Sequence, residues 1–86
     1  MSKLTPEFLQ QRGDNARRVL EDQVFCDAVK AVDAEFQRVV FATSLLEREK
    51  RENAFAAYSG FREALKVMRR WVTDADISRE NHKQQD

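Results

Sequence analysis

Hydrophobic residues between positions 44 and 72 recur at intervals of three and four, which is the spacing of an amphipathic helix. This spacing lines them along one face of a helix, while charged residues fall on the other side. We therefore predict a long helix over about residues 45–73, and it supplies most of the large side chains available to a core. The residues on its predicted apolar face are Ala54, Ala57, Tyr58, Phe61, Ala64, Leu65, Met68, Trp71 and Val72.

Both ends of this predicted helix carry signals. Ser44 followed three residues later by Glu47 is the capping-box pattern, in which each side chain satisfies a free backbone amide at the start of a helix. Beyond the helix the sequence is polar and has Ile77 as its one large apolar residue, so we expect residues 74–86 to form a flexible polar tail. In the middle, Gly60 costs about 1 kcal/mol relative to alanine, or it allows another backbone to approach closely.

A second amphipathic segment covers about residues 24–42, and its apolar residues also recur at intervals of three and four. Asp22 precedes it as a candidate N-cap, because its carboxylate can accept a hydrogen bond from a free backbone amide. Residues 41–43 end this segment and lead directly into the predicted cap of the long helix at Ser44. Because so short a connection makes consecutive helices antiparallel neighbours, we predict an αα-hairpin. The residues on the apolar face of this second helix are Phe25, Ala28, Val29, Val32, Phe36, Val39 and Val40.

The N-terminal segment predicts a shorter helix over about residues 6–20. Thr5 is a suitable N-cap, and Pro6 follows at the position where its missing amide costs nothing. Gly13 and Asp14 leave an alternative open, in which the segment breaks there and residues 1–12 form a mobile arm. We expect this helix to pack across the open side of the hairpin. The predicted fold is therefore all-α, with one domain over residues 1–73.

Composition agrees with a single small helical domain. The chain has 86 residues, of which 42% are hydrophobic, and it contains only two glycines and one proline. Charged residues make up 35% and cancel to a net charge of zero, so no overall field draws the protein toward nucleic acid or anionic lipid. The N-terminus lacks the apolar run of a signal peptide, and no segment approaches the ~20 apolar residues that cross a bilayer. We expect a protein that is neither secreted nor bound to a membrane.

No set of residues with the spacing of a catalytic or metal site is found. Cys26 is the single cysteine, which excludes an internal disulfide and predicts a half-buried thiol. His82 is the single histidine, and it falls in the predicted tail. There is no Ser-His-Asp or Cys-His combination, no glycine-rich phosphate loop and no cluster of metal ligands. We predict a non-enzymatic protein without a cofactor or metal.

Two features remain as candidate binding surfaces. The first is a candidate basic patch on the polar side of the long helix, which consists of Arg62, Lys66, Arg69 and Arg70. Acidic residues are interleaved with it and the pI is near 6.6, so we do not expect nucleic-acid binding. The second is a surplus of aromatic residues that are hard to bury in one small bundle. We predict that these residues bind a protein partner or another copy of the chain: Phe8, Phe41 and Trp71.

A string of residues between positions 12 and 72 resembles a group of small tailed-bacteriophage proteins that are encoded among head-morphogenesis genes. Phe55 stands where that group usually has tryptophan. The residues that carry the resemblance are Arg12-Gly13, Ala16, Val19-Leu20-Glu21, Phe25, Ala28-Val29 and Arg51-Glu52-Asn53-Ala54-Phe55.

The resemblance implies a structural or assembly role in a phage, in the host cytoplasm or in the virion. In that role the chain would be a small helical subunit that binds the portal, connector, capsid interior or packaging machinery. A second hypothesis is a helical inhibitor or adaptor that binds and occludes a host protein or defence complex. A cellular adaptor with no connection to phages also fits the composition. Stoichiometry separates the first two, because an assembly component forms defined oligomers or joins the particle, whereas an inhibitor captures one host protein.

Overall fold

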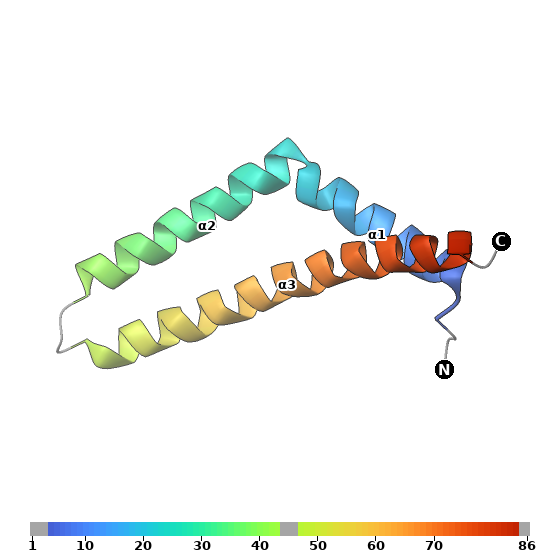
Figure 1. Cartoon of the computed structure of the whole chain (residues 1–86). Coiled ribbons are helices and arrows are strands. Elements are labelled where there is room, and N and C mark those ends of the chain that lie inside the picture. Colours follow the sequence, from blue (N-terminus) through green and yellow to red (C-terminus); the bar gives the residue numbers. More distant parts are fainter. Residues whose placement is uncertain (1–3, 44–46, 85–86) are drawn as a thin grey trace.

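The computed structural model describes residues 4–43 and 47–84, apart from the side chains of residues 82 and 84, and this part of the chain is entirely helical apart from short connections. Helix α1 spans Pro6–Glu21, α2 spans Gln23–Ala42 and α3 spans Arg48–Gln84. Helices α1 and α2 follow one another along the length of α3, and a bend between them gives the molecule the outline of a flat triangle (Figure 1). The predicted all-α fold is confirmed.

Capping residues explain where α1 and α2 begin. The Thr5 hydroxyl accepts a hydrogen bond of 3.1 Å from the Phe8 amide, and Pro6 occupies the first turn, as predicted. The Asp22 carboxylate accepts a bond of 2.9 Å from the Phe25 amide, while the Asp22 amide donates to the carbonyl of Val19. This single residue therefore ends α1 and begins α2. Helix α1 is continuous through Gly13 and Asp14, so the alternative of a break there is wrong.

Helix α3 is longer than the sequence predicted. It has 37 residues and continues to Gln84, where we expected a flexible tail from residue 74. That expectation is wrong for residues 74–84, because α1 packs against this segment and buries Ala75 to 1% exposure. Tertiary contacts of this kind outweigh a poor intrinsic helix propensity. At the other end α3 begins at Arg48, and the predicted cap at Ser44 lies outside the described residues.

Small residues let α1 approach α3 closely. A Cβ atom on Gly13 would overlap the Cβ of Ala75 and would come within 2.6 Å of the Trp71 carbonyl oxygen. Ala16 of α1 and Leu65 of α3 are also buried, at 5% and 2% exposure. Gly60 does not have the close-packing role considered for it, since nothing lies within 4 Å of its Cβ position. The close approach occurs at the other glycine.

The hairpin of α2 and α3 is present, but α1 does not pack across both of its helices. Instead α1 packs mainly against the C-terminal half of α3 and makes far fewer contacts with α2. The N-terminal half of α3 is left with α2 alone, and α2 contains no buried residue. The close fit of Gly13 against Ala75 and the Trp71 backbone accounts for the tight packing of α1 on this half of α3.

This arrangement gives an extended molecule. Its radius of gyration is 18.0 Å, whereas a compact chain of this length has about 12 Å. Its accessible surface is 6895 Å², whereas a compact monomer of this mass exposes about 5,300 Å². One chain therefore leaves much of its apolar surface in contact with water.

Candidate interaction surfaces

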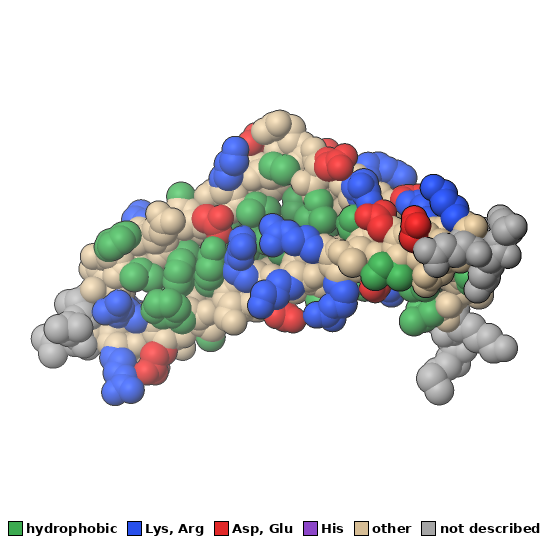
Figure 2. All heavy atoms as spheres, in the orientation of Figure 1, with side chains coloured by type: hydrophobic (Ala, Val, Ile, Leu, Met, Phe, Trp, Pro, Cys, Tyr) green, Lys and Arg blue, Asp and Glu red, His purple; other side chains and the backbone are tan. Residues whose placement is uncertain are grey.

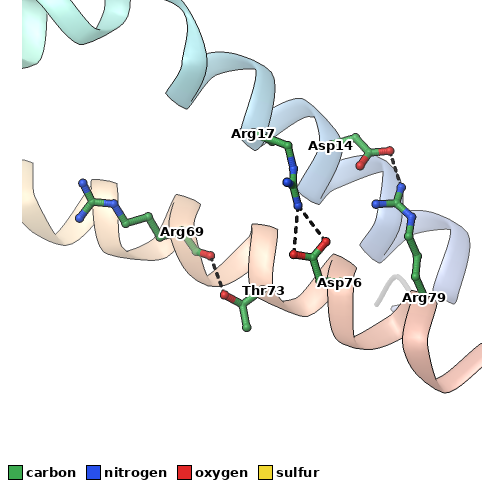
Figure 3. Close-up of polar contacts among 6 residues, drawn as sticks. All are labelled: Asp14, Arg17, Arg69, Thr73, Asp76 and Arg79. Carbon is green, nitrogen blue, oxygen red and sulfur yellow. Dashed lines mark hydrogen bonds and ion pairs between the residues drawn. The ribbon is translucent and has the colours of Figure 1, made fainter.

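Ion pairs join α1 to the C-terminal part of α3 (Figure 3). The Arg17 guanidinium donates to both carboxylate oxygens of Asp76, at 2.8 and 3.0 Å. One turn nearer the N-terminus of α1, Arg79 donates to Asp14 at 2.5 Å. This hydrogen bond lowers the pKa of the Asp14 carboxyl below its ordinary value and raises that of Arg79. Since these side chains are partly exposed, the pairs orient α1 more than they stabilise it.

Aromatic side chains form a cluster between α2 and the N-terminal half of α3. The rings of Phe36 and Tyr58 are stacked with their centroids 4.1 Å apart, and Phe55 meets Phe36 edge-on at 5.0 Å. The Tyr58 hydroxyl donates a hydrogen bond of 2.6 Å to Asp33, which raises the pKa of Tyr58 above its ordinary value. Phe55 is 50% exposed, and hydrophobic side chains are visible along this seam in Figure 2. The cluster holds the hairpin together without being enclosed by it.

A groove of about 400 Å³ lies beside this cluster, and we call it the hairpin groove. Its α3 wall includes the small residues Ala54 and Ala57, which leave space that larger side chains would fill. Glu35 is the one charged residue among those that line it. The remaining lining residues are Ala31, Val32, Phe36, Val39, Tyr58 and Phe61.

A second groove, of about 390 Å³, lies between α1 and α3, and we call it the α1–α3 groove. Its edge is formed by the Arg12 guanidinium, which lies 5.3 Å from the centroid of the Phe8 ring and 4.7 Å from that of the Trp71 ring. Arg12 is also the one charged residue that lines this groove, and its buried Nε atom has no hydrogen-bond partner. The other lining residues are Gln11, Asn15, Ala16, Val19 and Met68.

The three aromatic residues predicted to bind a partner do not form one patch. Phe8 and Trp71 both lie beside the Arg12 guanidinium. Phe41 is 86% exposed and belongs to the last turn of α2, near the opposite end of the molecule (Figure 1). Sequence reasoning also missed the hairpin groove, because it assigned Val32 and Ala57 to a closed core. The available signal was the number of alanines on the facing sides of the two helices, which are too small to fill the space between them.

The candidate basic patch keeps its positive charge. Lysine and arginine side chains gather over the middle of α3 in Figure 2. Within residues 4–43 and 47–84, the salt bridges involve none of its four members, Arg62, Lys66, Arg69 and Arg70. Arg12 and Arg17 of α1 instead face Asp74 and Asp76. The basic residues of α1 are thus largely neutralised by α3.

Groups with potential chemistry are few. The Cys26 thiol is half-buried, as predicted, and donates a weak hydrogen bond of 3.2 Å to the Leu20 carbonyl at the joint between α1 and α2. In the described part of the chain, no three His, Cys, Asp or Glu side chains are placed to hold a metal ion. The His82 side chain lies outside the description. None of the helices in the described ranges has the length and apolar character needed to span a bilayer.

Comparison with known families, curated proteins and solved structures gave no match. The resemblance to phage proteins therefore stays a prediction.

Proposed function

We propose that this chain is a non-enzymatic helical subunit that binds other proteins through its open hairpin. One observation carries the proposal: none of the described residues between positions 23 and 63 is buried, although this segment contains the whole of α2 and the aromatic cluster. Its large apolar side chains line the hairpin groove and form the aromatic cluster beside that groove. Surfaces of this kind on a small protein are typical of interaction sites.

The physical argument concerns stability. Burying apolar surface contributes about 25 cal/mol per Å², and this chain buries few side chains fully. Ordering the backbone costs about 1–2 kcal/mol per residue, so a small domain needs a nearly complete core. A protein partner that covers the hairpin groove would supply the missing burial. A catalytic role would require converging reactive groups, and the residues of this groove carry one carboxylate, Glu35.

We further propose that the partner belongs to a phage particle, as the portal, connector, capsid interior or packaging machinery. The support is the resemblance over residues 12–72 together with the unfilled hairpin groove, because components of assemblies complete their cores with neighbouring subunits. This protein would then act in the host cytoplasm or in the virion.

An inhibitor or adaptor of a host protein is the second candidate, and Phe41 favours it. This side chain is 86% exposed and lies apart from both grooves. A single exposed aromatic residue is typical of an anchor that enters a pocket on a partner.

Affinity purification of the tagged full chain from its native cells, infected where a phage source is known, separates the two candidates. We expect phage structural proteins to be identified by mass spectrometry, in a complex of high mass on size exclusion. A double variant, Val32→Asp with Ala57→Asp, should lose them because it places two charges in the hairpin groove. Phe41→Ser serves as the matched control and should keep them. Capture of one host protein that is lost with Phe41→Ser would instead support the inhibitor.

A further inference from the structure

The two grooves lie on the same side of α3, at equal distances from Ala64. Ala57 lines the hairpin groove and Trp71 lines the α1–α3 groove. Each is seven residues from Ala64, so the three residues fall on one line along the helix. A helix laid along this line would pass over both grooves.

We propose that this side of α3 binds a second copy of the chain, with the two α3 helices antiparallel and Ala64 next to Ala64 of the other copy. The twofold axis passes between the two α3 helices at the level of Ala64 and is perpendicular to both. This symmetry places α1 of each copy over α2 of the other. The proposal rests on the proposed function only in treating the grooves as protein-binding surfaces, and it names their occupant.

Shape supports a second copy because the two grooves are complementary to each other. The rotation exchanges positions 57 and 71, so Trp71 and Phe8 of one copy meet the hairpin groove of the other. Large aromatic side chains thereby face a groove of about 400 Å³ with Ala54 and Ala57 in its wall. The same contact occurs twice, as it must in an interface between identical surfaces.

Charge supports the same arrangement. Glu35 is the one charged residue that lines the hairpin groove, and Arg12 is the one that lines the α1–α3 groove. The rotation brings these opposite charges to the same end of the interface, where they would add to the pairs that each already makes in its own chain, Arg12 with Asp74 and Glu35 with Arg38. The buried Nε atom of Arg12 lacks a hydrogen-bond partner within its own chain. A net charge of zero also means that two copies do not repel each other at long range.

The backbone near the axis allows close approach. Ala64 is exposed, and nothing lies within 4 Å of the Cβ position of Gly60 one turn away. The chain's surface of 6895 Å² exceeds that of a compact monomer by about 1,600 Å². A protein interface of ordinary size buries about 800 Å² on each partner. The exposed excess is therefore large enough for a stable dimer.

Light scattering coupled to size exclusion tests the dimer with the full unmodified chain. We expect a mass twice the 10.1 kDa of one chain. The variant Ala57→Asp should weaken the dimer at least tenfold, because it puts a charge opposite Trp71 of the other copy. Its helicity by circular dichroism should stay unchanged, since Ala57 is exposed in a single chain. If light scattering gives the mass of a single chain at every protein concentration tested, the proposal is overturned.

Cysteine cross-linking tests the position of the axis. In a Cys26→Ser background, Ala64→Cys should form a disulfide-linked dimer rapidly on mild oxidation, because residues on the axis can meet the geometry of a disulfide. Lys66→Cys, two residues away and pointing to a different side of α3, is the matched control and should cross-link at least tenfold more slowly. Faster cross-linking at position 66 would overturn the arrangement. A monomer that still captures phage structural proteins would refute the dimer and leave the proposed function intact.

Discussion

Gly13 of α1 faces the backbone of Trp71 so closely that a Cβ atom on the glycine would lie 2.6 Å from the Trp71 carbonyl oxygen. The obstacle is backbone and cannot rotate away, so Gly13→Ala must push the two helices apart. We expect a net loss of stability, because overpacking costs about 1–3 kcal/mol while alanine regains about 1 kcal/mol in helix propensity. Urea unfolding monitored by circular dichroism measures the change.

Gly60→Ala is the matched control for this prediction. Its Cβ would meet nothing within 4 Å in the single chain, so at concentrations where the protein is monomeric the gain in helix propensity of about 0.5–1 kcal/mol remains uncompensated. We expect this variant to be more stable than the wild type. If both substitutions shift the midpoint in the same direction, then Gly13 does not have the close contact described.

Deletion of residues 74–86 should remove the helicity of α1 as well as that of the deleted segment. The reason is that Ala75 and the carboxylates of Asp74 and Asp76 belong to the surface on which α1 packs. Circular dichroism at equal concentration gives the number of helical residues lost. A loss limited to the deleted segment would show that α1 does not depend on it.

Local signals in the sequence predicted the elements well, while packing between distant residues was harder to predict. Thr5 and Asp22 are capping residues whose effect is confined to the next turn, so the starts of α1 and α2 could be read directly. The length of α3 depends on Gly13 meeting Ala75, residues that are far apart in the sequence. No local pattern around residue 75 reports that contact, and its polar neighbours wrongly suggested a tail.

The candidate surfaces show the same division. The sequence predicts that Phe8, Phe41 and Trp71 exceed what a small core can hold, and Phe8 and Phe41 are exposed. Their grouping could not be predicted, because it depends on α1 packing beside the C-terminal half of α3. Helical periodicity marks the face that avoids water, but it does not reveal whether that face is covered by the same chain.

The stability of the protein should depend on the Asp14–Arg79 pair at neutral pH and lose that dependence in acid. The folded pKa of Asp14 is lowered by the hydrogen bond from Arg79. The contribution of the pair is therefore complete above the ordinary pKa of 3.8 and is lost as the pH falls through the lowered value. Thermal melts of Arg79→Met and wild type should differ at neutral pH and converge in acid.

Arg38→Met provides the control for this pH dependence. Arg38 also lowers the pKa of a carboxyl, that of Glu35, but both residues lie on α2. Loss of this pair should leave the contact between α1 and α3 unchanged, so we expect a smaller shift of the melting temperature. An equal shift in the two variants would mean that the Asp14–Arg79 pair does not help to hold α1 on α3.

Tyr58 should titrate above its ordinary pKa of 10.0, chiefly because its hydroxyl donates a hydrogen bond to Asp33. The chain contains one tyrosine, so the absorbance change on ionisation reports this group alone. Asp33→Ala removes the acceptor and should lower the measured pKa, whereas Asp27→Ala, on the same helix but without this contact, should not. An unchanged pKa in Asp33→Ala would show that the bond is absent in solution.

Leu65 and Phe36 each lie on the predicted apolar face of a helix, yet aspartate at the two positions should have different effects on stability. Leu65 is 2% exposed, so Leu65→Asp buries a charge without a partner and should destabilise the protein by several kcal/mol. Phe36 borders the open hairpin groove, where water can reach a new carboxylate, so Phe36→Asp should leave α1 and the C-terminal half of α3 folded. Hydrogen exchange resolved by residue would show this as protection that persists around Ala16 and Ala75. Global loss of protection in both variants would mean that the hairpin and the α1–α3 contact unfold as one unit.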